Sequence, residues 1–134
     1  MNIYAVNYIL SRLSFTMAAA LAIPLVLAIV GEEASREAFM LSVFVSIFFG
    51  IAFRRYGERS DDLTPREGIA ITAFGWFTGT FLGMLPYLLG HYLGFLDALF
   101  ESISGFTGTG ATVFGTLDGV PYSILFWRMM TAWI

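Results

Sequence analysis

The sequence predicts an all-helical integral membrane protein in which one short segment enters the membrane without crossing it. Only 13% of the 134 residues are charged, against about 25% in a typical soluble domain, and the mean hydropathy is +0.76. Three apolar stretches have the length of membrane spans. After the third lies LDALFESISGFTGTGAT, residues 96–112, whose helix-forming part is too short to span and too apolar for an exposed loop.

Two spans are expected within residues 1–62, at about residues 8–30 and 35–53. Pro24 lies inside the first span and is expected to kink it, because proline lacks the amide N–H that a helix interior needs. The second span is short unless its helix begins near Ser35, whose hydroxyl is suited to an N-cap. These residues are therefore interpreted as a pair of leading helices.

The loop after the second span gives the expected orientation. Residues 54–62 contain three arginines, and Arg66 follows closely. Because cytoplasmic loops are enriched in basic residues, this loop is placed in the cytoplasm. Two spans precede it, so the N-terminus is also expected in the cytoplasm, and the segment after the third span is expected to open outward.

The third span is expected at residues 65–89. It opens with Thr64, a proline at the first helical position and Glu67, the pattern of a capping box. Within it, small residues recur at every fourth position, which gives a face that a second helix can approach closely. The glycines of this predicted packing face are Gly75, Gly79 and Gly83.

The segment that follows is interpreted as a re-entrant half-helix. A short helix is expected at residues 97–104, with Asp97 as its N-cap, and extended backbone at residues 107–112. A fourth helix is expected from Pro121 onward. The 14 residues from there to Ile134 give only about 21 Å of helix, so we expect the chain to be the front part of a longer protein.

The re-entrant segment has the chemistry of a monovalent-cation filter. The negative end of the short helix's dipole would point at the membrane interior. Glycine and alanine leave carbonyl oxygens accessible, and a ring of such carbonyls can replace the hydration shell of a cation. Threonine hydroxyls can add oxygens or brace the backbone. The candidate potassium ligands are Thr107, Gly108, Thr109, Gly110, Ala111 and Thr112, with Thr109 and Gly110 central.

Two charges are expected to support this filter. Arg128 lies in the fourth apolar segment, and an arginine within the membrane needs a partner. It would repel a cation if it pointed at the ion path, so we expect it to pair with Glu101 or with carbonyls of the short helix. Together with Asp97, these residues form the predicted filter support.

Three strings carry a resemblance to a known family: LTPREG (residues 63–68), DALFESISGFTGTGATV (residues 97–113) and FWRMMTAWI (residues 126–134). They resemble the Trk/Ktr/HKT superfamily of potassium transporters, and within it the TrkH-type subunits. Members carry two leading helices and four tandem repeats of helix M1, pore helix, filter and helix M2. The resemblance implies that residues 63–134 are the first repeat, incomplete in M2. The family's filter glycine matches Gly110, whereas Gly108 stands where the family usually has threonine.

The resemblance implies potassium uptake across the bacterial inner membrane, with this chain supplying one quarter of a selectivity filter. It further implies a homodimer of the full-length subunit and a cytosolic nucleotide-binding regulatory ring. The other three filter walls would come from the remaining repeats, or from a homotetramer if the chain is complete. The chain is also expected to be surrounded by membrane lipid. No enzymatic activity and no cofactor are expected. No nucleic-acid partner is expected either, because the arginines form no dense basic patch.

The sequence offers two other interpretations. A small non-conducting membrane scaffold could pack partner helices through the Gly75, Gly79 and Gly83 face, but packing alone does not explain a re-entrant half-helix. A glycine-rich nucleotide-binding loop is excluded, because the G-x-G-x-x-G spacing and a preceding strand are both missing. The sequence has no cysteine and a single histidine, so it contains no pattern for a thiol site or a metal site.

Overall fold

Five helices make up most of the protein, whose computed structural model describes residues 1–116 and 118–133. The helices are α1 (Ile3–Val30), α2 (Arg36–Arg55), α3 (Pro65–Leu89), α4 (Phe95–Phe106) and α5 (Tyr122–Trp133). No strand occurs among the described residues, and the predicted all-α class is confirmed. Leu117 and Ile134, the latter belonging to the predicted fourth apolar segment, lie outside the described residues.

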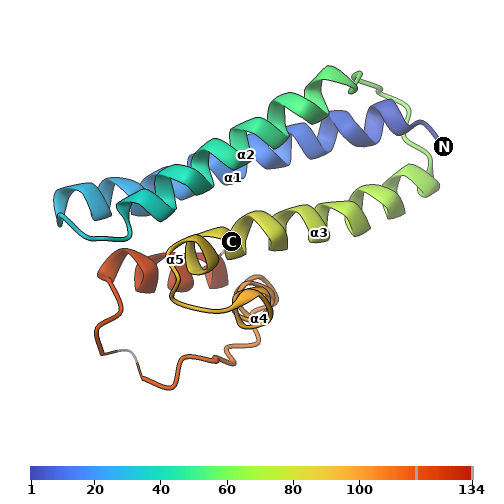
Figure 1. Cartoon of the computed structure of the whole chain (residues 1–134). Coiled ribbons are helices and arrows are strands. Elements are labelled where there is room, and N and C mark those ends of the chain that lie inside the picture. The colour runs from blue at the N-terminus through green and yellow to red at the C-terminus, as the bar shows by residue number, and fades with distance from the viewer. Residues whose placement is uncertain (117, 134) are drawn as a thin grey trace.

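The three long helices form the body of the molecule (Figure 1). Helices α1 and α2 are an antiparallel hairpin along their whole length, and α3 returns beside them. All three are long and apolar enough to cross a membrane. At 1.5 Å per residue they measure about 42, 30 and 37 Å, against a hydrocarbon core of about 30 Å. The short helix α5 lies near the α1–α2 loop, whereas α4 packs against α3 and α5 (Figure 1).

The first hairpin differs in detail from the prediction. Helix α1 begins at Ile3, earlier than expected, because the side chain of Asn2 accepts the backbone N–H groups of Tyr4 and Ala5 at 3.1 and 3.3 Å. The helix continues through the buried Pro24 without interruption. Ser35 stands at the N-cap position of α2 as predicted, but its side chain makes no capping hydrogen bond. Its hydroxyl is engaged elsewhere, as described below.

Helix α3 occupies the expected residues and has the expected capping box. The Glu67 carboxylate accepts the backbone N–H of Thr64 at 2.9 Å. The same carboxylate accepts the backbone N–H of Asn2 at 2.6 Å, although 65 positions separate the two residues. Glu67 therefore ties the beginning of α1 to the beginning of α3.

The buried core lies at the opposite end of the molecule, where all five helices contribute to it. Its large, fully buried side chains come from four different helices: Leu21, Phe39, Leu82, Tyr87 and Trp127. Ala98 adds a contact from α4 and is also 0% exposed. The core therefore fixes the two short helices against the long ones, and it sets the position of the loop that connects α4 with α5.

Candidate functional site

Helix α4 is longer than the predicted short helix and begins at a different residue. The N-cap is Gly94, in extended backbone, and the helix runs from Phe95 to Phe106. The expectation that Asp97 is the N-cap is therefore wrong. Asp97 lies in the first turn and is exposed, where a carboxylate still interacts favourably with the positive end of the helix dipole. The prediction failed because the preference of aspartate for caps does not locate the start of a helix.

Gly83 lets α4 approach α3 closely. A Cβ built at Gly83 would lie 2.5 Å from Cε2 of Phe106 and 2.8 Å from the hydroxyl oxygen of Ser102. That hydroxyl donates to the backbone carbonyl of Thr80 at 2.8 Å in a fully buried contact. Any larger residue at position 83 would push the short helix away from α3.

Helix α5 is held at the same place. The indole N–H of Trp127 donates to the carbonyl of Gly83 at 2.9 Å, and the indole is 0% exposed. On its other side, α5 contacts α4 where the side chain of Thr131 lies against Gly105 and leaves no room for a Cβ there. Two glycines therefore set the spacing of α3, α4 and α5.

The backbone turns sharply where α4 ends. Gly108 and Gly110 have φ values of +68° and +77°, a region that favours glycine, and a Cβ built at either would meet nothing within 4 Å. The amide of Thr109 donates to the carbonyl of Ser104 at 3.1 Å, and the hydroxyls of Thr107 and Thr109 are 2.8 Å apart. Residues 107–112 are all exposed in this chain.

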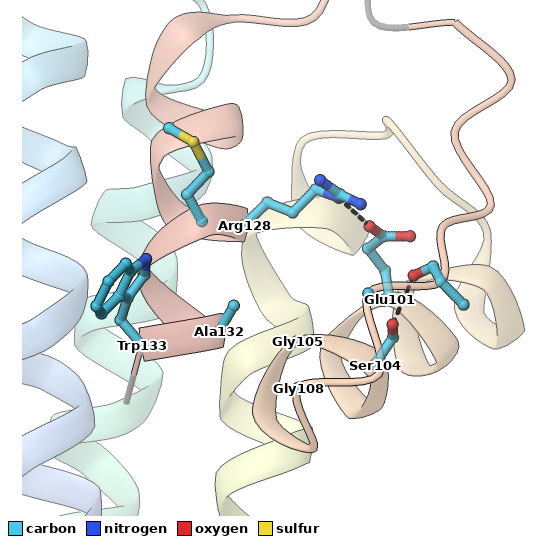
Figure 2. A pocket seen from close by; sticks show the side chains of 10 residues that line it. Glu101, Ser104, Gly105, Gly108, Arg128, Ala132 and Trp133 are labelled. Atoms are coloured by element: carbon cyan, nitrogen blue, oxygen red, sulfur yellow. Dashed lines mark hydrogen bonds and ion pairs between the residues drawn. The ribbon is translucent and has the colours of Figure 1, made fainter.

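Glu101 is the centre of a buried hydrogen-bond cluster behind this loop. Its side chain is 1% exposed and forms an ion pair with Nε of Arg128, whose side chain is 26% exposed. Figure 2 shows the two side chains reaching toward each other from α4 and α5. The carboxylate also accepts the hydroxyl of Thr112 and the backbone N–H of Val113, both at 3.0 Å. One carboxylate thus joins the short helix, the loop and α5.

Three predicted ligand groups are partly occupied by such internal contacts. The hydroxyl of Thr112 is turned toward Glu101, and it accepts the backbone N–H of Phe114 at 3.1 Å. The carbonyl of Ala111 accepts the hydroxyl of Ser104 at 2.5 Å (Figure 2). The hydroxyl of Thr107 donates to the carbonyl of Ile103 at 2.7 Å, at the end of α4. These three side-chain or backbone groups brace the loop.

A cavity of about 250 Å³ lies between α4, the loop and α5 (Figure 2). Glu101 and Arg128 line one part of it, and the backbone of Gly108 and Gly110 lines another. Its remaining lining residues are Ser104, Gly105, Ala111, Met129, Ala132 and Trp133. Among the described residues there is no group of three histidine, cysteine or acidic side chains that could hold a metal ion.

The predicted glycine packing face is divided. Gly83 contacts α4 as described, Gly75 lies 3.7 Å from Leu13 when given a Cβ, and Gly79 meets nothing within 4 Å. Gly75 and Gly79 instead line an apolar groove of about 320 Å³ between α1 and α3. Within this chain, only one of the three glycines brings another helix into close contact.

A polar cluster at the start of α5 was not predicted from the sequence. The Glu33 carboxylate accepts the hydroxyl of Ser123 and its backbone N–H, the latter at 3.1 Å, and the Ser35 hydroxyl at 3.2 Å. Burial raises the pKa of Glu33, but these hydrogen bonds outweigh it and the pKa lies below the ordinary glutamate value. The sequence signals for this cluster were a carboxylate and a serine in the short loop between α1 and α2, and the proline at the start of α5.

These features define the class: an all-α integral membrane protein with three spans and a short helix that leads into a glycine-rich loop. A family model for TrkH, described as a cation transport protein, matches residues 35–134. The chain belongs to this TrkH family of cation transport proteins.

Known relatives agree with this assignment. The chain is 32% identical over 136 residues to the Trk system potassium uptake protein TrkH of Escherichia coli K12, which covers 99% of this chain and 28% of the relative. It is 29% identical to an uncharacterized cation transporter of Methanocaldococcus jannaschii, over 84% of this chain and 24% of the relative. The crystal structure of the potassium transporter TrkH from Vibrio parahaemolyticus superimposes with a TM-score of 0.92 at 29% identity, over 99% of this chain and 29% of that chain. The chain thus spans less than a third of these relatives.

Proposed function

We propose that this chain takes part in potassium uptake across the bacterial inner membrane and supplies one quarter of a selectivity filter. The observation that carries the proposal is the loop after α4, where Gly108 and Gly110 adopt positive φ angles with open space beside them. Such backbone can turn successive carbonyl oxygens toward one side. The relatives named as potassium uptake proteins and as a potassium transporter support the choice of ion.

In this proposal α4 is the pore helix and its carboxyl end faces the ion. The helix dipole places a partial negative charge at that end, which favours a cation beside residues 108–110. Helices α3 and α5 then correspond to M1 and M2 of one repeat, and α1 and α2 are the leading helices. The other three walls come from further repeats of the same kind.

The Glu101–Arg128 ion pair supports the filter from behind. The buried carboxylate offsets the charge of the guanidinium, so the pair adds no net positive charge beside the ion. Asp97 adds a weaker contribution through the dipole of the same helix. The assembly proposed for the full-length protein is a homodimer that binds a cytosolic nucleotide-binding ring, with the arginine-rich loop in the cytoplasm and the filter open to the outside.

Growth of a potassium-uptake-deficient bacterium on limiting potassium tests this proposal. Gly110→Ser in the full-length protein is expected to abolish growth or to admit sodium, because any side chain at φ +77° strains the filter backbone. Gly119→Ser is the matched control, since Gly119 has φ +78° with open surroundings but lies outside the filter. Unchanged potassium flux and potassium-over-sodium selectivity in Gly110→Ser would refute the filter assignment.

The alternative of a non-conducting scaffold has less support. Of its three glycines, Gly83 is already covered by α4 within the chain. Membership in a family of cation transport proteins also favours conduction over anchoring. The open groove at Gly75 and Gly79 is compatible with a neighbouring helix of a larger transporter.

A further inference from the structure

Two arginines face one tyrosine at the end of the α1–α2 hairpin that is remote from the filter. The guanidinium carbon of Arg54 lies 4.9 Å from the centroid of the Tyr8 ring. Arg12 follows Tyr8 by one helical turn on α1, so the two side chains lie on the same face of that helix. Two cationic groups from different helices therefore share one side of the hairpin.

Neither arginine has an acidic partner among residues 1–116 and 118–133. The ion pairs there are Arg59 with Asp61 and Arg128 with Glu101. Glu58 is nearby through its backbone N–H, which donates to the carbonyl of Tyr4 at 3.0 Å, but its carboxylate forms no ion pair with either guanidinium. Arg12 and Arg54 are both exposed, and the adjacent Arg55 adds a further positive charge.

Helix lengths place these groups at a membrane surface. A hydrocarbon core of about 30 Å corresponds to about 20 helical residues, and counting back from Val30 along α1 reaches the other boundary close to Arg12. Helix α2 has 20 residues and ends at Arg55, so Arg54 lies at that same boundary. Two independent helices thus put both guanidinium groups at the depth of lipid phosphates.

The surface just deeper in the membrane is apolar. Phe15 and Ile51 each lie three residues deeper than one of the arginines and are 40% and 58% exposed. The Phe15 ring lies against Gly50, where a Cβ would be only 2.8 Å from it, so the ring covers the seam between the two helices. A lipid with its phosphate at the arginines would meet this apolar surface with its acyl chains.

We propose that Arg12, Arg54 and the Tyr8 hydroxyl bind the phosphate of an anionic phospholipid. Guanidinium groups match phosphate oxygens with paired N–H donors, and the hydroxyl can add a third donor. The assignment to a lipid rests on the membrane depth and the apolar surface beneath. The orientation proposed above places the site in the cytoplasmic leaflet, where anionic lipids are attracted to basic residues, but the site itself does not depend on that orientation.

Native mass spectrometry of the full-length protein, exchanged from phosphatidylcholine into mixtures with phosphatidylglycerol, tests the site. Each arginine near an anionic surface contributes a factor of about five in lipid affinity, so Arg12→Gln combined with Arg54→Gln is expected to lower phosphatidylglycerol retention by more than tenfold. Arg36→Gln is the matched control, because Arg36 is an exposed arginine at the opposite end of α2. Equal retention in the double variant and in the control would overturn the proposal.

Two further arms complete the test. Inorganic phosphate at millimolar concentration in lipid-free detergent is expected to leave the thermal unfolding midpoint of the wild type unchanged, and stabilisation there that the double variant lacks would assign the site to a free anion instead. If the double variant cannot be recovered, each single variant is measured, with about a fivefold loss expected. No loss in either single variant would refute the site. Potassium uptake is recorded in parallel, so that a failure of the proposed transport function is seen separately from a failure of lipid binding.

Discussion

The Glu33 carboxylate accepts the backbone N–H of Ser123 at 3.1 Å, although 90 positions separate the two residues in the sequence. Ser123 belongs to the first turn of α5, where backbone N–H groups lack partners within the helix. The Ser35 and Ser123 hydroxyls are 2.6 Å apart and fully buried beside it. The loop between α1 and α2 thus provides an N-terminal cap for the helix that carries Arg128.

Removal of the Glu33 charge is expected to loosen α5. Glu33→Gln keeps the size of the side chain but loses charge-assisted hydrogen bonds to Ser123, so the free energy of unfolding should fall by about 1–2 kcal/mol. The midpoint of thermal unfolding of the full-length protein measures this. Glu32→Gln is the control, because Glu32 is exposed in the same loop. A similar midpoint for the two variants would show that the cap contributes no stability.

The same carboxylate predicts a pH dependence. The pKa of Glu33 is lower in the folded protein than in the unfolded chain, because hydrogen bonds from Ser123 and Ser35 outweigh the effect of burial. Its contribution to stability is therefore complete above the unfolded pKa of about 4.3, and it is lost as the pH falls through the lower folded pKa. The midpoint difference between wild type and Glu33→Gln should be constant from pH 8 to 6 and should shrink below about pH 4.5. A difference that grows on acidification would have the wrong sign.

Gly83 offers a test of the packing between α3 and α4. Gly83→Ala places a Cβ 2.5 Å from the Phe106 ring and 2.8 Å from the Ser102 hydroxyl. Such overpacking typically costs about 1–3 kcal/mol, and it should also reduce potassium flux by displacing the helix before the filter. Gly68→Ala is the control, because a Cβ there meets nothing within 4 Å and alanine is the better helix former. Equal flux and stability in both variants would mean that the contact tolerates a methyl group.

Structural features that depend on residues close together in the chain could be predicted from the sequence. The three spans follow from the length of apolar runs, and α3 begins at its capping box because Thr64 and Glu67 are close in the chain. The Glu33–Ser123 contact could not be found in this way, since it exists only after the hairpin and α5 have packed together. Tertiary contact also decides which glycine of the repeated set is buried, and that glycine is Gly83.

The glycine-rich loop shows the same division. Positive φ angles at Gly108 and Gly110 agree with the expectation that these glycines permit unusual backbone. The engagement of the Ala111 carbonyl by Ser104 and of the Thr112 hydroxyl by Glu101 depends on how the loop folds back along α4. Residue type alone therefore named six candidate ligands, but it could not show which of their groups are engaged in hydrogen bonds within the chain.

The pairing of Glu101 with Arg128 leads to the strongest expected effect. Removing one member of a buried ion pair leaves the other charge uncompensated, which costs about 3 kcal/mol. Arg128→Gln should therefore lower the unfolding midpoint and weaken potassium-over-sodium selectivity, because Glu101 also holds Thr112 and Val113 of the loop. Glu101→Gln should have a similar effect through the stranded arginine.

The double variant Glu101→Gln with Arg128→Gln distinguishes a specific pair from two independent positions. If the two charges act mainly on each other, the double variant should lose less stability than the sum of the two single variants, with a coupling of about 1 kcal/mol or more. Thr112→Val provides the comparison, since it removes one hydrogen bond to Glu101 but leaves the ion pair in place. Additive losses of stability, with ion selectivity unchanged in the two single variants and in the double variant, would show that the pair neither stabilises the fold as a unit nor supports the filter.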